Sequence, residues 1–417
     1  MLPRKINLLT SSAESSAIDR LLGKIYLPLL CLLCLFSVIH YLRVSSLLAE
    51  VWSGWAIGDW TINYDTGATR RGLAGTIILF FARTFNLKIN WLVFSLQAVA
   101  LIAFIGLFLN LIRKKVLTFW YVIACFSPGF FLLFTYYDSM AIGRKEILLF
   151  LTFTAWVAVC NQGKATTFKV IIFSAIYFFL TLVHEAFVFY SPYFCVVLWF
   201  AQSSSSSKLL VAIPVSSFTA AAVTFLYFKT VDPIISCDRL LALGASPEVC
   251  IGILSSGSQD AMLLINQYFN DFGELALFNL CLVFTIILLP VYLITHSAIL
   301  TLGNKRRWLG CVFLLIIFSF PLFIFAIDWG RWISIHVTLS VVMLLLVLNN
   351  KAEQTIKIDN QTRPTQIALT FIFASVCFIF FTLTFSLGHC CTRDFFRLLG
   401  PFHKVQHIGI FQPNAGH

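Results

Sequence analysis

Charged residues are scarce in this chain. Only 11% of its 417 residues are Asp, Glu, Lys or Arg, and 59% are hydrophobic, whereas soluble domains carry about 25% charged residues. So few charges cannot keep a globule of this size in solution, but they suit a protein whose outer surface faces lipid. A mean hydropathy of +0.89 agrees with this interpretation. The composition therefore excludes an ordinary soluble protein.

Patterns typical of metal or nucleic-acid binding are also lacking. None of the arrangements of the 12 Cys suggests a metal site, and we expect no cofactor. No basic run alternates with aromatic residues in a polar segment, so we attribute the net charge of +11 to cytoplasmic loops and expect no nucleic-acid partner. Cys237 and Cys250 lie in the one long polar loop. They can form a disulfide if that loop is extracytoplasmic, although spacing alone does not fix the pairing.

Long apolar stretches recur along the chain. A helix needs roughly 20 apolar residues to cross the hydrocarbon core of a bilayer, and about eleven segments meet or approach that length. These segments are 25–45, 89–112, 116–137, 143–160, 169–184, 186–202, 209–228, 274–296, 309–326, 331–348 and 367–386. The sequence therefore predicts an all-α bundle that spans the membrane and forms one domain over residues 25–386. It shows no internal repeat of the kind found in two-halved transporters.

The positions of Lys and Arg predict the orientation of the bundle. Short cytoplasmic loops are enriched in these residues. With the N-terminal segment 1–24 inside, every predicted cytoplasmic loop carries at least one of them, including the triplet 113–115. Loops 46–88 and 229–273 and the tail 387–417 then lie outside the cytoplasm.

One apolar segment, 73–87, is too short to cross the membrane comfortably, at only about 15 residues. We interpret it as an interfacial or re-entrant helix that follows the first outer loop. If it crossed the bilayer, every later segment would invert and the triplet 113–115 would move outside, against the bias of basic residues. The outer loop 229–273 contains Pro and Gly and predicts irregular structure with a short helix.

Charged and titratable residues gather at the predicted outer ends of the spans. Charges at membrane depth are costly, so each is a candidate functional residue. The cations are Arg70, Arg71, Arg144, Lys145 and Arg331, and the acids and the histidine are Asp59, Glu146, His184, Glu185 and Asp328. Guanidinium groups match phosphate geometry, and a carboxylate or an imidazole can deprotonate a hydroxyl. This combination predicts a site that binds a lipid diphosphate and transfers the attached sugar.

Structural roles compete with this hypothesis at each position. The pair 70–71 can anchor the following apolar segment at the interface, and 144–146 can be the ordinary start of a helix. The dipeptide 184–185 can form a surface corner, and Asp328 and Arg331 can form an ion pair that holds a tight turn.

The order of these motifs resembles multi-pass bacterial proteins of surface-polysaccharide gene clusters, above all the O-antigen and capsule repeat-unit polymerases. The resemblance covers the general architecture and four patches: Asn63-Tyr64 to Arg70-Arg71-Gly72-Leu73, Arg144-Lys145-Glu146, His184-Glu185 and Asp328-Trp329-Gly330-Arg331-Trp332. It implies an inner-membrane enzyme that joins undecaprenyl-diphosphate-linked repeat units on the periplasmic side, without a nucleotide sugar or a required metal. A chain-length regulator and a flippase are the candidate protein partners that go with this activity. One departure is that the 229–273 loop contains only Arg239 where these enzymes carry Arg-rich motifs.

Two other interpretations remain open. Multi-span glycosyltransferases that use polyprenyl-phosphate sugars also place an acid in the first outer loop before an interfacial helix. Asp59 or Asp65, followed by 73–87, matches that plan, and Asp59 would then be the expected base. A lipid-glycan flippase or transporter would bind the same diphosphate, but such proteins carry pseudo-repeats and charges near the midplane. For the polymerase we predict phosphate binding by the arginines and Lys145, a base at Glu185 or His184, and orientation by Asp59 and Asp328.

Overall fold

A computed structural model gives the fold of most of the N-terminal three quarters of the chain. The residues it describes are 10–50, 54–65, 67, 69–115, 117, 119–138, 141–162, 165–201, 209–227, 233–243, 266, 270, 285, 302–326, 328–346, 348, 385–387 and 396–398. The predicted spans 274–296 and 367–386 lie wholly or largely outside these residues.

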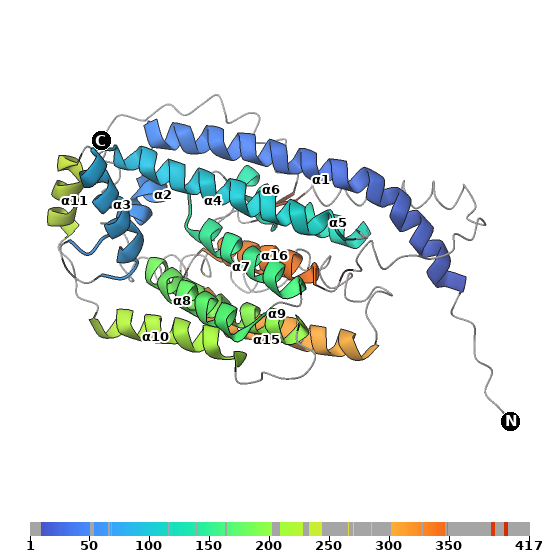
Figure 1. Cartoon of the computed structure of the whole chain (residues 1–417). Helices are drawn as coiled ribbons and strands as arrows, with labels where there is room; N and C mark the ends of the chain where they lie inside the picture. Colours follow the sequence, from blue (N-terminus) through green and yellow to red (C-terminus); the bar gives the residue numbers. More distant parts are fainter. Residues whose placement is uncertain are drawn as a thin grey trace.

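Helices make up almost all of the described structure (Figure 1). They are α1 (Thr10–Glu50), α2 (Gly54–Thr61), α3 (Gly72–Phe85), α4 (Ile89–Ile112), α5 (Phe119–Cys125), α6 (Phe131–Tyr137), α7 (Glu146–Asn161), α8 (Thr167–Val183), η2 (Glu185–Tyr190), α9 (Ser191–Ala201), α10 (Ala212–Tyr227), α11 (Pro233–Ala242), α15 (Leu302–Phe325) and α16 (Trp329–Leu344). Strands β1 (Phe385–Leu387) and β2 (Phe396–Leu398) pair antiparallel, with Ser386 opposite Arg397. The predicted helical fold is thus confirmed for the described part of the chain. Residues 385–386, the end of predicted span 367–386, instead lie in β1, where Phe favours a strand.

Three described helices are long and apolar enough to cross a membrane. The apolar windows are Tyr26–Ser46 in α1, Ile89–Ile112 in α4 and Arg307–Ile324 in α15, with 21, 24 and 18 residues. At 1.5 Å per residue each covers most or all of a hydrocarbon core of about 30 Å. Five predicted spans coincide with shorter helices of 16 or 17 residues, which are α7, α8, α10, α16 and the continuous stretch of η2 and α9 over Glu185–Ala201. The total of eleven spans stays a prediction.

The predicted span 116–137 is not the single continuous helix that we expected. Its residues form two short helices, α5 and α6, separated by a bend at Ser127-Pro128-Gly129. Pro128 has no N–H to donate and its ring prevents a continuous helix. The interrupted backbone is buried, and the N–H of Phe131 donates to Thr338 Oγ1 of α16 at 3.0 Å. Irregular backbone within a membrane protein requires such internal partners.

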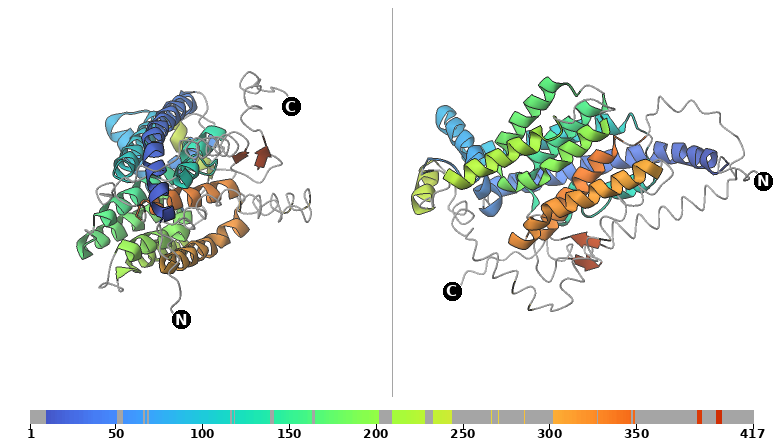
Figure 2. Two further views of the ribbon diagram at one scale, coloured as in Figure 1. Left: turned by 90° about the vertical axis from the view of Figure 1, so that its right-hand side faces the viewer. Right: turned by 90° about the horizontal axis from the view of Figure 1, so that it is seen from below.

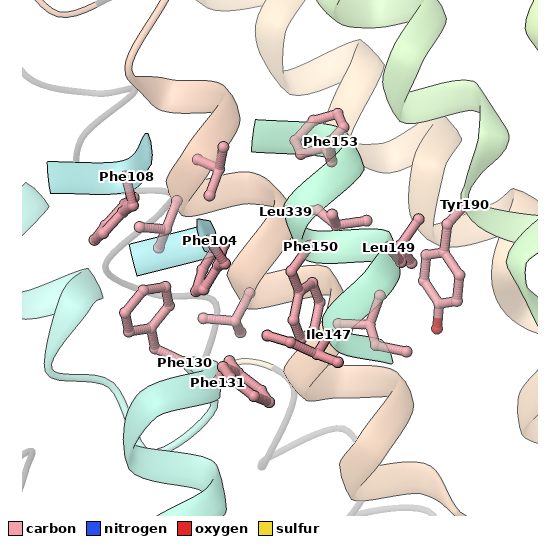
Figure 3. Packing of buried hydrophobic residues seen from close by; sticks show 14 of the residues in the cluster. Phe104, Phe108, Phe130, Phe131, Ile147, Leu149, Phe150, Phe153, Tyr190 and Leu339 are labelled. Atoms are coloured by element: carbon pink, nitrogen blue, oxygen red, sulfur yellow. The ribbon is translucent and has the colours of Figure 1, made fainter. Parts of the chain in front are cut away.

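A layer of aromatic side chains forms the centre of the bundle (Figure 3). Phe104 of α4, Phe131 of α6 and Phe150 of α7 contact one another, with ring centroids 4.9–6.1 Å apart. Helix α16 adjoins them, and all its residues from Trp329 to Leu344 are buried. Its neighbour α15 lies beside it in both views of Figure 2 (orange). The buried α16 therefore connects the core to the charged segment at its own N-terminus.

Helices α2, α3 and α11 lie together at one end of the bundle (Figure 1). Arg239 Nη1 of α11 donates to the backbone oxygen of Asp65 at 2.8 Å, so the loops 46–88 and 229–273 share one face as predicted. Helix α11 is the short helix expected in the second loop. Its Cys237 carries a disulfide bond, whereas Cys250 lies outside the described residues, so their pairing stays a prediction.

Helix α3 is the predicted helix at 73–87. Its axis crosses those of α1 and α4 in Figure 1, which is the arrangement expected of an interfacial helix, and its 14 residues are too few to cross a bilayer. Gly75 allows close packing against the preceding loop, because a Cβ there would come within 2.1 Å of the Ile62 oxygen. Its opposite face exposes Phe80, Phe81 and Phe85.

Lys115 differs from the rest of the predicted orientation triplet. Arg113 and Lys114 are exposed, but Lys115 is only 1% exposed. Its Nζ donates to Asn161 Oδ1 at 3.0 Å and to the Leu348 oxygen at 3.1 Å. Lys115 therefore joins the ends of α4, α7 and α16, a structural role that the charge pattern did not indicate.

Candidate functional site

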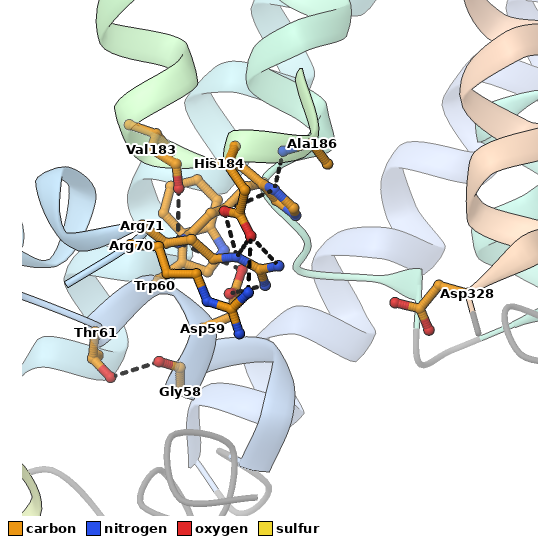
Figure 4. A network of polar contacts seen from close by, with 12 residues as sticks. Gly58, Asp59, Trp60, Thr61, Arg70, Arg71, Val183, His184, Ala186 and Asp328 are labelled. Atoms are coloured by element: carbon orange, nitrogen blue, oxygen red, sulfur yellow. Dashed lines mark hydrogen bonds and ion pairs between the residues drawn. The ribbon is translucent and has the colours of Figure 1, made fainter. Parts of the chain in front are cut away.

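Arg71 is the centre of a polar group at the end of the bundle that holds α2 and α3 (Figure 4). Its Nε donates to both carboxylate oxygens of Glu185 at 3.0 and 2.8 Å, and its Nη2 donates to Glu185 Oε1 at 2.8 Å. Its Nη1 reaches Asp59 Oδ1 at 3.4 Å. Glu185 is 114 positions away in the sequence. The contact therefore joins the first outer loop to the turn between α8 and η2.

The backbone at Arg71 is held in an unusual conformation. Its φ of 65° lies in the left-handed region, which typically costs a non-glycine residue about 1 kcal/mol or more. The next residue is Gly72, where a Cβ would come within 2.3 Å of the Tyr64 ring. The close packing predicted around the two arginines is thus present. It turns the chain sharply into α3 and directs the Arg71 side chain at Glu185.

Lys145 lies beneath this group and is completely buried. Its Nζ is 3.6 Å from Asp59 Oδ2 and donates to the Val183 oxygen at 3.1 Å. Asp59 is therefore held between Lys145 on one side and Arg71 on the other. Lys145 also ties the start of α7 to the end of α8.

His184 and Glu185 form a buried corner and not a surface turn. Helix α8 ends at Val183, and His184, only 1% exposed, caps the following 3₁₀ helix η2. Its Nδ1 accepts from the N–H of Ala186 at 3.3 Å, which leaves Nε2 to carry the proton of the neutral ring. Glu185 Oε2 is 3.8 Å from Nδ1, and the Glu185 side chain is 15% exposed.

These contacts shift the pKa values of the group. Burial by itself would raise the pKa of Asp59. The positive charges of Lys145 and Arg71 have the larger effect and hold this pKa well below its usual range. Burial likewise raises the pKa of Glu185, and the charge and hydrogen bonds of Arg71 bring it well below normal. Burial and the Arg71 charge lower the pKa of His184 to about 4. At neutral pH both carboxylates are ionised and the histidine is neutral.

Arg70 lies at the exposed edge of the same group. Its Nη1 is 3.9 Å from Glu185 Oε1, and its side chain is 41% exposed. With Arg71 and Lys145, three basic side chains face the two carboxylates Asp59 and Glu185. The surplus positive charge lies on the side that solvent reaches, which favours an anionic ligand there.

A second charged group lies next to the first. Arg331 of α16 donates through Nε to Glu146 Oε1 at 3.1 Å, and its Nη2 contacts the same oxygen. Its Nη1 contacts Asp328, so the predicted ion pair of these two residues is confirmed. Glu146 follows Lys145 directly, and the start of α7 therefore contributes one side chain to each group. Arg144 is half-buried, and its charge interacts with those of Arg331 and Asp328.

The predicted site residues thus meet at one end of the bundle, but in two adjoining groups. The first contains Asp59, Arg70, Arg71, Lys145, His184 and Glu185, and the second contains Arg144, Glu146, Asp328 and Arg331. Asp328 lies apart from the residues around Arg71 in Figure 4. The distances place Asp328 beside Arg331 and not beside Asp59 or His184.

Comparison with known proteins gives no family for the chain. No family model matches it, and no curated protein and no solved structure is significantly similar. Within the described part of the chain, no group of three or more His, Cys, Asp and Glu residues is arranged to hold a metal ion.

Several polar residues that support the site were not predicted. Trp60 Nε1 and Gln97 Nε2 both donate to the Gly143 oxygen, at 2.6 and 2.8 Å, and the Gly143 N–H donates to the Tyr41 hydroxyl. Gly143 has a φ of 80°, which glycine tolerates. This network holds the turn that precedes Lys145. A polar Gln97 within an apolar span was the one signal that could have found it.

A further buried histidine lies in the core. His336 of α16 contacts the Tyr193 hydroxyl through Nδ1 at 2.8 Å and Ser319 Oγ through Nε2 at 2.5 Å. Both ring nitrogens are therefore satisfied, and the residue joins α9, α15 and α16. Its position in the apolar run 331–348 signalled an interior role, which charge clustering alone overlooked.

Proposed function

We propose that this protein is a glycosyltransferase of the bacterial inner membrane that joins polyprenyl-diphosphate-linked repeat units into a surface polysaccharide. One observation carries the proposal: Arg71, 29% exposed, is held by Glu185 and Asp59 beside the more exposed Arg70. An anion-binding pair, a carboxylate base and a buried support meet in one place, as glycosyl transfer from a lipid diphosphate requires.

Arg70 and Arg71 are the proposed diphosphate-binding residues. Both are part-exposed, and guanidinium groups can each give two parallel N–H donors to a phosphate. They also lie at the N-terminus of α3, where backbone N–H groups favour an anion. Their charge would stabilise the diphosphate both when it binds and when it leaves.

Glu185 is the proposed base. A diphosphate on Arg71 competes for the N–H groups that now bind Glu185, which raises the pKa of the carboxylate. Glu185 then takes the proton of an acceptor sugar hydroxyl, and the hydroxyl oxygen bonds to the anomeric carbon of the donor. The bond from that carbon to the phosphate oxygen breaks, and polyprenyl diphosphate leaves with the electron pair. Buried His184, with a pKa of about 4, suits the support of this corner better than proton abstraction.

The remaining charges act as supports in this proposal. Asp59 and Lys145 fix the position of Arg71 through an ion-paired chain. Arg331, paired with Glu146 and Asp328, and the adjoining Arg144 support the end of the bundle next to the diphosphate site. A chain-length regulator and a flippase remain candidate partners of the polymerase.

A second candidate is a glycosyltransferase that uses a polyprenyl-phosphate sugar. The observation in its favour is Asp59 on α2, in the first outer loop and directly before the crossing helix α3. Asp59 would then be the base and would need to separate from Lys145. The two candidates differ in product, because the second adds single sugars and the first produces a ladder of repeats.

The test is reconstitution of the purified protein in lipid vesicles with polyprenyl-diphosphate-linked repeat units from its own source. We expect a ladder of products on a gel without added nucleotide sugar. Arg71→Ala and Glu185→Gln should each reduce ladder formation at least about 100-fold, since each removes a group acting on the transition state. Single-sugar extension that depends on a polyprenyl-phosphate sugar would identify the second candidate.

Arg83→Ala is the matched control. Arg83 also lies on α3 and pairs with an outer-loop carboxylate, Asp65, but it is outside the Arg71 group. This variant should retain the wild-type ladder. A full ladder from Arg71→Ala in correctly folded protein would contradict the proposal.

A further inference from the structure

Glu146 is buried with half of its carboxylate unused. The side chain is 7% exposed, and both Arg331 contacts are made to Oε1. Oε2 is buried and has no hydrogen-bond partner among the residues that the structure describes. A buried carboxylate oxygen without a donor is costly, and such atoms in native proteins usually bind a ligand or an ordered water. Arg331 fixes the carboxylate so that Oε2 remains available.

Trp332 has the complementary feature. Its ring centroid is 5.3 Å from the Arg331 Cζ, so it contacts the same guanidinium that holds Glu146. Its Nε1 is buried and also lacks a partner within the described part of the chain. The indole N–H can only donate, whereas Glu146 Oε2 can only accept while ionised. An unsatisfied donor and an unsatisfied acceptor therefore adjoin one arginine.

We propose that Glu146, Arg331 and Trp332 form a carbohydrate subsite that binds a hydroxyl group of the glycan. A sugar hydroxyl donates one hydrogen bond and accepts others, so glycan hydroxyl groups supply both the donor that Glu146 Oε2 lacks and the acceptor that Trp332 Nε1 lacks. A phosphate does not fit here, because Glu146 would repel it.

The position of the subsite agrees with this assignment, which rests on the proposed function. Lys145 and Glu146 are consecutive, and they point into the Arg71 group and the Arg331 group, respectively. A lipid-linked glycan with its diphosphate on Arg70 and Arg71 therefore has this subsite beside it. The diphosphate and the sugar would be recognised by different residues, which makes the two contributions separable.

The test compares two lipids by native mass spectrometry of the full-length protein. One is undecaprenyl diphosphate, and the other is the same lipid carrying its glycan, purified from membranes of the source organism. We expect the wild type to bind the glycan-bearing lipid about tenfold more tightly. Trp332→Phe and Glu146→Gln should each bring this ratio close to one while binding of the bare lipid diphosphate stays unchanged.

Both substitutions are chosen to preserve the fold. Phenylalanine keeps a buried aromatic ring, and no internal hydrogen bond is lost because Nε1 makes none within the described residues. Glutamine keeps an acceptor for Arg331 but presents an N–H₂ in place of Oε2. Trp308→Phe is the matched control. Trp308 Nε1 is also buried and has no partner among the described residues, but Trp308 lies near the N-terminus of α15, against Phe200 and away from Arg331. This variant should leave the ratio at the wild-type value.

The outcomes separate the subsite from the proposed function. The proposed function is overturned if the wild type binds neither lipid, or if Arg71→Ala binds undecaprenyl diphosphate as tightly as the wild type does. Binding of the diphosphate through Arg71 with a glycan preference that survives in both Trp332→Phe and Glu146→Gln overturns the subsite alone. That result would mean that a buried water satisfies the two groups.

Discussion

Arg71 and Glu185 show how much of the site depends on single side chains. The three contacts that Arg71 makes to Glu185 span 2.8–3.0 Å, and charge-assisted pairs of this kind are stronger than neutral hydrogen bonds. Lysine at this position would keep the charge but lose the planar pair of donors. The left-handed backbone at Arg71 adds strain that the surrounding contacts offset.

His184 predicts a dependence of stability on pH. Its pKa is about 4 in the folded protein, against about 6.5 in an unfolded chain. The unfolded state therefore binds a proton first, and stability falls as the pH drops from about 6.5 to 4. A shift of this size corresponds to about 3 kcal/mol at the acid limit. Below that range protonation of Asp59 and Glu185, whose pKa values are depressed, destabilises the protein further.

Thermal denaturation of the purified protein in detergent at pH 7.5, 6.0 and 5.0 measures this effect. The wild type should lose stability steadily over the three values. His184→Gln removes the titrating group and should give a flatter profile between pH 7.5 and 5.0. Parallel profiles for the two proteins would show that His184 is not buried in the neutral form.

Helix α3 is positioned by the glycine at which it meets the preceding loop. A Cβ on Gly75 would lie 2.1 Å from the Ile62 oxygen, and backbone cannot move aside as a flexible side chain can. Gly75→Ala should therefore destabilise the protein by about 1–3 kcal/mol and displace Arg71. A lowered melting temperature in detergent, together with reduced ladder formation, checks this expectation.

Gly106→Ala provides the comparison for that experiment. Nothing lies within 4 Å of a Cβ at Gly106 of α4, and alanine favours a helix over glycine by up to about 1 kcal/mol. This variant should be as stable as the wild type or slightly more so. Equal behaviour of the two variants would contradict the close contact between α3 and the first outer loop.

The bundle as a whole predicts a single orientation in the membrane. Arg83 lies on α3 with the charged groups, whereas exposed Lys114 and buried Lys115 lie beyond the far end of α4. In a cysteine-free background a membrane-impermeant maleimide added from outside should label Arg83→Cys. Lys114→Cys should react only after the membrane that holds the protein is opened, and Lys115→Cys should remain protected. If only Lys114→Cys were labelled in intact cells, the orientation of the bundle would be the reverse of the predicted one.

Much of the architecture was predictable because it depends on local composition. The long apolar runs of α1, α4 and α15 and the short helix α3 were recognised from length and hydropathy. The break at Pro128 was missed, although a proline in a span is a visible warning. The burial of Lys115 was missed because its partners, Asn161 and Leu348, are distant in the sequence.

The sequence by itself determined that the chain has segments long and apolar enough to span a membrane and that its charges lie at the ends of apolar segments, since both follow from the transfer of side chains between water and lipid. Only the tertiary structure decided which charges pair. Arg71 meets Glu185 and Arg331 meets Glu146 across 114 and 185 positions, and such contacts depend on how α3, α7, η2 and α16 pack. Packing also separated one expected cluster into two adjoining groups and left Glu146 Oε2 and Trp332 Nε1 without partners within the described structure.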